Sequence, residues 1–131
     1  MVKAGSNPTF QARQIVYLEQ DNSRLYTEVI QVIASRQLCW VRPLMLATFP
    51  KNAKTLPTLP KAETLYDMRQ ASDLVWYLSL FSPALDTEVI PLITQLDSPA
   101  LQIEEEAIVR QRIHRFIQTL WEANKENLLE S

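Results

Sequence analysis

Cysteine and histidine are the residue types in this chain that could act as nucleophile and base, and each occurs once. Cys39 lies between Leu38 and Trp40, and His114 comes much later in the chain. Together they could form a thiolate and its base. Lone cysteines in apolar surroundings are usually structural, however, and a zinc site needs three or four such ligands. We therefore predict a buried, inert Cys39, no metal, no cofactor and no catalytic residue. The chain is predicted not to be an enzyme.

Charged residues near the C-terminus form one acidic run and one basic run. The acidic run is Glu104, Glu105 and Glu106, and the basic run is Arg110, Arg112, His114 and Arg115, with Trp121 nearby. Adjacent glutamates point around a helix rather than together, so they favour the amino-terminal half of a helix over a cation site. The basic run could contact nucleic acid, but acidic residues share its helix and favour a solvated face. A nucleic-acid-associated regulator is thus an alternative function, and nucleic acid is an unlikely partner.

Two arginines and one aspartate are candidates for a polar cluster set into a sheet. They are Arg42, Arg69 and Asp73, and the predicted strand order brings Glu28 and Asp67 near them. Such a cluster would either hold the carboxylate of a substrate or partner, or form an internal ion pair that compensates the charge of Arg42. We favour the internal pair, and both interpretations stay open. The other alternative function, a small-molecule-binding protein, requires these three residues to converge in a deep cavity.

Aromatic side chains are the best candidates for contact with a protein partner. Trp76 and Tyr77 are consecutive in a predicted strand, where successive side chains face opposite ways. One of them should therefore be exposed, and an exposed aromatic ring at a sheet edge or groove is a natural anchor for a partner. The predicted partner-binding residues are Trp76, Tyr77, Trp121, Arg42, Arg69 and Asp73.

The near absence of glycine excludes several function classes. The chain has a single glycine, Gly5. Phosphate-binding loops, dinucleotide-binding turns and nucleophile elbows depend on glycine, which enters left-handed backbone conformations without a Cβ clash. The nucleotide-binding and hydrolase classes that use these loops are therefore disfavoured.

Length and composition predict one soluble intracellular domain. The chain has 131 residues, 47% of them hydrophobic and 21% charged, with a net charge of −2. This charge gives no general attraction to nucleic acid or anionic membranes. The single cysteine excludes an internal disulfide, no apolar run reaches the roughly 20 residues of a membrane span, and Met1–Asn7 lacks the apolar core of a signal peptide. We expect a cytoplasmic protein that does not associate with membranes.

The densest apolar stretch, Leu25–Phe49, predicts a central hairpin. It is rich in β-branched residues, which suit a pleated sheet better than a helix, and it is interrupted only at Ala34–Gln37. Leu38–Ala47 is apolar on both faces, so both faces should be covered. Pro43 cannot donate to the strand ladder, which indicates a bulge or local edge.

The remaining pattern predicts an α+β fold. It is a single domain over 10–131, with about five strands in a mostly antiparallel curved sheet and two C-terminal helices packed against it. The expected elements are a flexible tail at 1–9, a strand within Phe10–Glu19, a proline- and lysine-containing loop at 50–62, strands at Glu63–Met68 and Leu74–Phe81, a short helix at Asp86–Leu96 and a long helix at 98–127.

Three segments carry a resemblance to known proteins. They are EVIQVIASRQLCWVRPLMLA (Glu28–Ala47), DMRQASDL (Asp67–Leu74) and LFSPALDTEVIPLI (Leu80–Ile93). They resemble a family of small conserved cyanobacterial proteins of unassigned activity, and in particular the carboxysome shell accessory (assembly) proteins. The resemblance implies a cyanobacterial adaptor, in the cytoplasm or at the carboxysome, that binds the tail of a shell protein. It assigns no residue roles. The first expected function is a non-catalytic protein-binding adaptor with a groove between the sheet and the last helix.

Overall fold

The computed structural model describes residues 9–51, 61–98 and 105–130. The described residues form an α+β domain, as predicted. Its elements are β1 (Ile15–Gln20), β2 (Ser23–Ile33), a 3-10 turn η1 (Ala34–Arg36), β3 (Leu38–Thr48), β4 (Thr64–Asp67), β5 (Leu74–Tyr77), a 3-10 turn η3 (Leu78–Leu80), β6 (Phe81–Pro83), α1 (Asp86–Leu96) and α2 (Glu106–Glu130). The predicted tail at 1–8 and most of the predicted loop, residues 52–60, lie outside the described residues.

The predicted central hairpin is confirmed as β2 and β3, which pair antiparallel from Ser23↔Thr48 to Ile33↔Leu38. The turn between them closes without glycine. Gln37 takes a left-handed conformation, with φ of 58°, and its side-chain Nε2 donates to the carbonyl oxygen of Ala34 over 3.0 Å. Asp21 also takes a left-handed conformation, in the β1–β2 turn, with φ of 55°. Polar side chains thus replace glycine at these tight turns.

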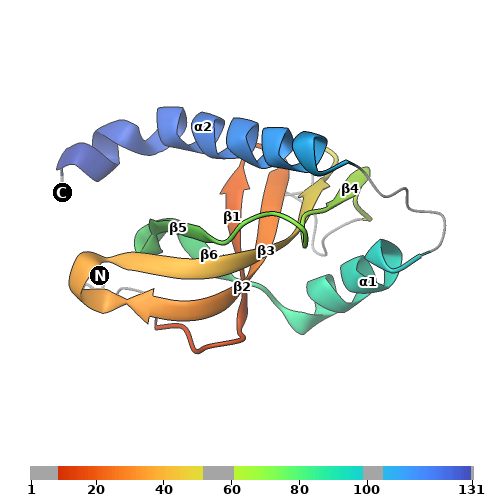
Figure 1. Cartoon of the computed structure of the whole chain (residues 1–131), viewed down its shortest axis with the longest axis horizontal. Helices are drawn as coiled ribbons and strands as arrows, with labels where there is room; N and C mark the ends of the chain where they lie inside the picture. Colours follow the sequence, from red (N-terminus) through yellow and green to blue (C-terminus); the bar gives the residue numbers. More distant parts are fainter. Residues whose placement is uncertain (1–8, 52–60, 99–104, 131) are drawn as a thin grey trace.

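The sheet is strongly curved because β3 changes partner along its length. Its first half, Leu38–Val41, pairs with β5, and its second half, Met45–Thr48, pairs with β4. The register with β2 shifts between Tyr26 and Thr27, opposite Pro43, which confirms the predicted bulge. At the other edge β6 pairs with β1, although only η3 separates β6 from β5. The two sides of the sheet therefore curl toward each other (Figure 1).

The structure has six strands in its described part, one more than predicted, because the apolar run Leu74–Phe81 is not one strand. It is β5, then η3, then the first residue of β6. The ladder with β3 ends at Leu38↔Tyr77, the first residue of β3, so β5 has no further partner. The next residue, Leu78, instead donates its N–H to the carbonyl oxygen of Gln37 over 2.9 Å, and the chain turns toward β1.

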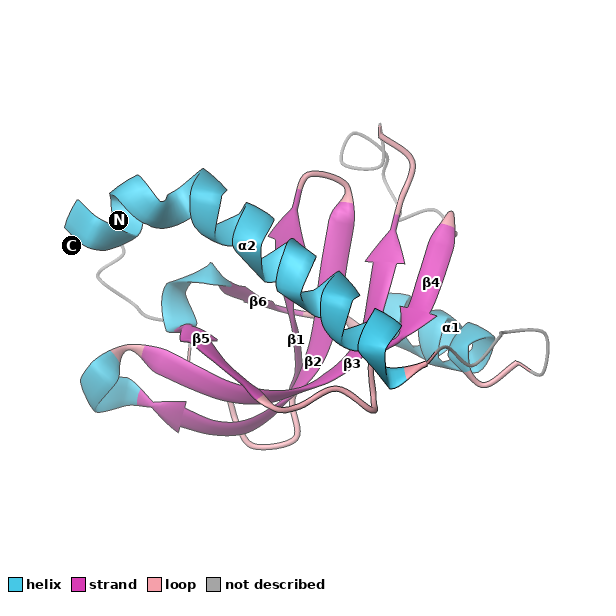
Figure 2. Ribbon diagram, turned by 45° about the horizontal axis from the view of Figure 1, so that its top comes forward, coloured by secondary structure: helices cyan, strands magenta, loops and turns pink. Residues whose placement is uncertain are grey.

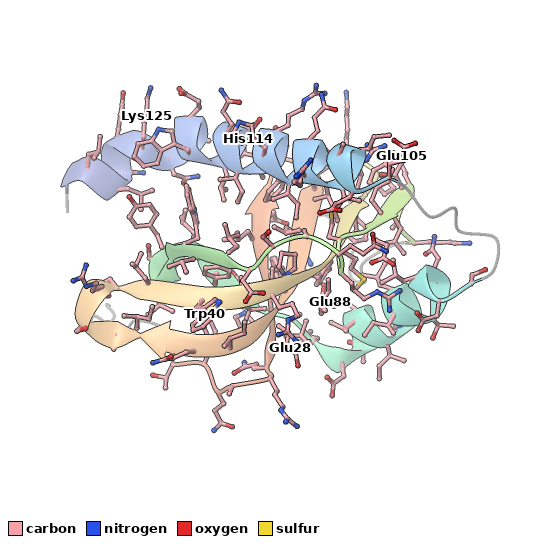
Figure 3. The ribbon with its side chains drawn as sticks, in the orientation of Figure 1. Glu28, Trp40, Glu88, Glu105, His114 and Lys125 are labelled. Carbon is pink, nitrogen blue, oxygen red and sulfur yellow. The ribbon has the colours of Figure 1, made fainter. Side chains whose placement is uncertain are left out.

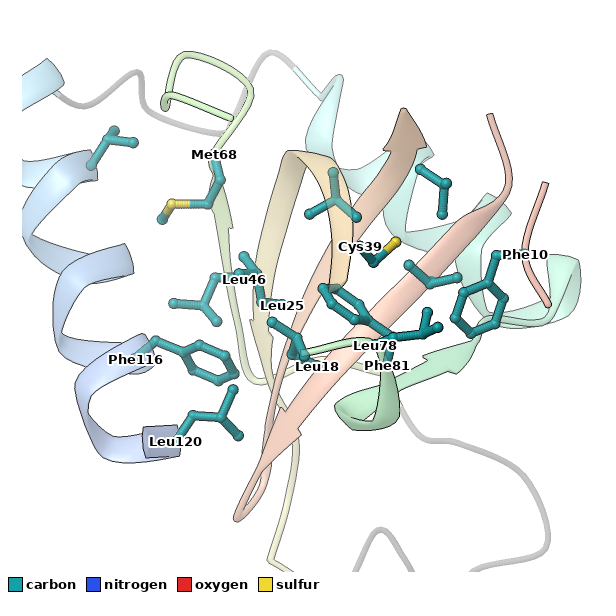
Figure 4. Close-up of a cluster of buried hydrophobic side chains, with 14 residues drawn as sticks. Phe10, Leu18, Leu25, Cys39, Leu46, Met68, Leu78, Phe81, Phe116 and Leu120 are labelled. Carbon is teal, nitrogen blue, oxygen red and sulfur yellow. The ribbon is translucent and has the colours of Figure 1, made fainter. Parts of the chain in front are cut away.

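Both faces of the hairpin are covered, as its sequence predicts. One side packs a core closed by the buried residues Val109, Phe116 and Leu120 of α2 (Figure 4). The other side packs a second core closed by the residues Val89, Leu92 and Leu96 of α1. The two helices lie on different sides of the sheet (Figure 2).

The short helix has the predicted bounds, whereas the long one does not. In α1 the side chain of Glu88 accepts the N–H of Leu85 over 2.9 Å at the helix start. Ser98 is not helical, residues 99–104 lie outside the described ranges, and α2 runs from Glu106 to Glu130. Neither helix in the described ranges combines the length and hydropathy needed to cross a membrane.

Candidate functional site

The edge strand β5 lies beside the last turns of α2, and four of the six predicted site residues lie on it, next to it or over it. Among the described strands β5 pairs only with β3. Its opposite edge therefore has no strand partner there, and the main-chain groups on that edge are a template for a further strand. Figure 1 shows the C-terminal turns of α2 above this edge.

Three predicted residues form one aromatic cluster, defined as Trp76 and Tyr77 of β5 and Trp121 of α2. The Trp76 ring meets Tyr77 at a centroid distance of 5.3 Å and Trp121 at 6.4 Å, edge-on in both cases. The rings of Tyr77 and Trp121 are near parallel, at 6.3 Å and 16°. All three residues are half-buried. The structure thus brings these three rings together between the sheet and the last helix, and the predicted groove stays a prediction.

The expectation that Trp76 and Tyr77 face opposite ways is wrong at the level of their rings. Strand alternation fixes the directions of the Cβ atoms, but a long ring on an uncovered edge strand can fold back over that edge. Both rings do so and meet Trp121. The indole Nε1 of Trp76 is buried and has no acceptor in the described part of the chain. A buried donor without a partner costs about 1–3 kcal/mol.

The last turns of α2 extend beyond the core that the helix covers. The buried positions of α2 are Val109, Phe116 and Leu120. The next positions toward the sheet are Ala123, which is exposed, and Asn124, whose Nδ2 donates to the carbonyl oxygen of Leu120 over 2.8 Å. About ten residues, or about 15 Å of helix, follow Leu120. Trp121, the first residue of this overhang, contacts the rings of Trp76 and Tyr77.

Arg42 and Asp73 form the predicted pair, but at the surface. Arg42 Nε lies 3.8 Å from Asp73 Oδ1, and the two side chains are 57% and 39% exposed. Asp73 Oδ2 also accepts the Nε1–H of Trp40 over 3.1 Å. Arg42 therefore has an acidic partner and is also exposed to solvent. Asp73 directly precedes β5.

Arg69 belongs to a different place, so the predicted convergence with Arg42 and Asp73 does not occur. Its guanidinium bonds both carboxylate oxygens of Asp67, at 3.0 and 2.9 Å, and Asp97 Oδ1 at 3.0 Å. It therefore ties the end of β4 to the end of α1. Partial burial acts to raise the pKa of Asp67, but the hydrogen bonds from Arg69 outweigh it and hold that pKa below its ordinary value.

A polar network around Arg24 was not predicted. Arg24 Nε lies 2.8 Å from Glu19 Oε2, and its Nη1 lies 2.7 Å from Glu88 Oε2. The guanidinium stands over the ring of Tyr17 at 4.3 Å. Glu88 Oε2 also accepts the hydroxyl of the buried Tyr26 over 2.6 Å. Glu19 and Arg24 are cross-strand neighbours across the β1–β2 turn, a pairing that the sequence could have indicated. The contact between Arg24 and Glu88, which lie 64 residues apart in the sequence, could not be predicted from any sequence pattern.

The cysteine and the histidine do not form a catalytic dyad. Cys39 is completely buried, and burial raises the pKa of its thiol. His114 is exposed on α2 (Figure 3). Across the described ranges no group of three or more histidine, cysteine or acidic residues could hold a metal ion.

A scan against protein-family models and searches of curated proteins and solved structures all find no match to this chain. The resemblance to carboxysome shell accessory proteins therefore stays a prediction.

Proposed function

We propose that this chain is a non-catalytic protein-binding adaptor that takes an extended segment of a partner along the free edge of β5, beneath the overhang of α2. The observation that supports this most directly is the placement of the aromatic cluster on that edge. Large, half-exposed rings supply most of the energy at protein interfaces, and an unpaired strand edge supplies a ladder of main-chain donors and acceptors.

The neighbouring groups favour a peptide as the occupant. The partner would displace Trp121 partly from Trp76, and a main-chain carbonyl of the bound segment would then accept the N–H that Trp76 leaves unpaired. Asp73 directly precedes β5 and pairs with Arg42 of β3, and both side chains would bind charged or polar groups at the rim. A small metabolite cannot pair with the main chain of a strand edge, whereas an extended peptide can bind both the edge of β5 and the aromatic cluster.

The resemblance of Glu28–Ala47, Asp67–Leu74 and Leu80–Ile93 to carboxysome accessory proteins makes a shell-protein tail the first partner to test. Under this proposal the protein acts in the cytoplasm or at the carboxysome of a cyanobacterium. The nucleic-acid alternative is weaker, because Arg110 and Arg112 project about 200° apart around α2 and do not share a face.

The test is the affinity of the full chain for synthetic shell-protein tails and for a displayed library of random linear peptides. Trp121→Ala should weaken binding by about tenfold or more, which corresponds to at least 1.4 kcal/mol. Leu129→Ala is the matched control, because Leu129 is an apolar residue on the same overhang and is 70% exposed.

Each outcome has a distinct meaning. Loss of tail binding in Trp121→Ala but not in Leu129→Ala supports the full proposal. Binding of library peptides alone, with the same dependence on Trp121, supports the adaptor with another partner and rejects the shell tail. If neither source yields a ligand, or if Trp121→Ala binds normally, the proposed function is wrong.

A further inference from the structure

A cavity of about 290 Å³ lies between α2 and the β1–β2 turn, on another part of the molecule from the aromatic cluster. Its wall on the turn side includes Asp21 and Asn22, and its wall on the helix side includes Arg112 and Arg115. The volume equals the share of about ten water molecules in the liquid and lies at the lower end of the range for ligand sites.

Two apolar side chains are part of the cavity lining. Leu46 of β3 and Phe116 of α2 line it, and both are buried members of the main core. A ligand that fills the cavity would therefore place a short apolar body against these two side chains. A simple hydrated ion would leave this surface without a contact, so the lining favours an organic molecule.

The two arginines project from the same side of α2. They are three positions apart in the sequence, which places them about 60° apart around the helix axis. The guanidinium of Arg112 lies over the ring of Tyr66 at 3.7 Å, which fixes its position. Arg115 forms no ion pair with a described residue. The guanidinium of Arg115 is therefore available to an anion in the cavity.

Among the described lining residues, one is acidic. Asp21 lies on the cavity wall, in the left-handed position of the β1–β2 turn. The charged side chains among the described lining residues are thus those of Arg112, Arg115 and Asp21. The side chains of Asn22 and Thr119 add uncharged polar groups to the wall. This combination suits a ligand with one oxyanion directed at the arginines.

We propose that this cavity binds a small organic anion that carries one carboxylate or phosphate group on a short apolar body. Arg112 and Arg115 bind the oxyanion through charge-assisted hydrogen bonds, and Leu46 and Phe116 contact the apolar part. The two oxyanion chemistries share this recognition, and the probes below separate them. The site is independent of the proposed protein-binding function, because it uses none of the residues of the aromatic cluster.

The experiment is a titration of the full chain, followed by NMR of its backbone amides, with 3-phenylpropionate, phenyl phosphate and inorganic phosphate as separate probes. The organic anions should bind more tightly than inorganic phosphate, with shifts at the β1–β2 turn and at Gln111–Thr119. Arg115→Gln should weaken binding by about tenfold. Asp21→Asn should strengthen it by about threefold or more, because a repulsive charge is removed.

Arg110→Gln is the matched control. Arg110 is exposed on α2, lies about 200° around the helix from Arg112 and does not line the cavity. Its replacement removes the same charge from the same helix and should leave the affinity unchanged. The proposal is overturned if no probe binds at millimolar concentration, if Arg110→Gln and Arg115→Gln weaken binding equally, or if the shifts lie elsewhere. Normal anion binding by Trp121→Ala would separate this site from the proposed function.

Discussion

Arg24 Nη1 lies 2.7 Å from Glu88 Oε2, and this contact joins the central sheet to the first turn of α1. The same carboxylate oxygen accepts the hydroxyl of Tyr26, and Glu88 Oε1 accepts the N–H of Leu85. The carboxylate of Glu88 thus interacts with the guanidinium of Arg24, the hydroxyl of Tyr26 and the main-chain N–H at the start of α1. The position of α1 against the sheet depends on it.

Glu88→Gln should lower the free energy of unfolding by about 1.5–3 kcal/mol, since the charge that faces Arg24 is lost from a largely buried pair. Urea unfolding measures this change. Glu122→Gln is the control, because Glu122 pairs with Lys125 on the surface of α2 and such pairs contribute about 0–1 kcal/mol. Equal effects of the two substitutions would show that the network does not hold α1.

Tyr26 should make the protein less stable at alkaline pH. Burial, together with the hydrogen bond to Glu88, raises the pKa of Tyr26 far above the ordinary tyrosine value of about 10. The folded state therefore binds this proton more tightly than the unfolded state does. The resulting stabilisation is fully present below about pH 10 and is lost as the pH rises through the folded pKa. The free energy of unfolding should fall above pH 10 in the native chain and less steeply in Tyr26→Phe. Identical slopes would contradict this assignment.

Because the buried apolar positions of α2 end at Leu120, substitutions before and after this residue should differ in their effect on stability. Leu120→Ala should cost about 2–5 kcal/mol, as for other buried leucines. Leu129→Ala lies on the overhang and should change stability by less than about 0.5 kcal/mol. Thermal and urea unfolding of both variants check this. A large loss in Leu129→Ala would mean that the overhang packs against more than the aromatic cluster.

Cys39 should be unreactive in the folded protein. Its side chain is buried, and burial raises its pKa, so the reactive thiolate is disfavoured. Alkylation at neutral pH should be slow in buffer and fast in denaturant, with mass spectrometry as the readout. Rapid labelling of the native chain would indicate that the core around β3 opens readily.

The elements whose signal is local could be predicted from the sequence. The β-branched run of Leu25–Phe49 determines its own hairpin, and Pro43 marks its bulge. Asp86–Leu96 is a helix at its predicted bounds. The break at Leu78 could not be predicted, because the run LVWYLSLF contains no glycine, proline, asparagine or aspartate. That break arises where β3 begins and leaves β5 without a partner.

The candidate site was predictable in its residue types and not in its grouping. Trp76, Tyr77 and Trp121 could be selected as candidate anchors from their size, but their contact depends on the path of α2 over β5. The separation of Arg69 from Arg42 likewise follows from Asp97, at the end of α1. The contacts that Trp121 and Asp97 make with the sheet depend on how the two helices pack, and no local pattern in the sequence indicates them.

Hydrogen exchange at the backbone amides of Leu74–Tyr77, with and without a bound peptide, tests the central claim most directly. An added strand would protect the amides of β5 that point away from β3, and we predict slower exchange there, which Trp121→Ala should abolish. Protection confined to α1 or to the β1–β2 turn, with β5 unchanged, would contradict the account.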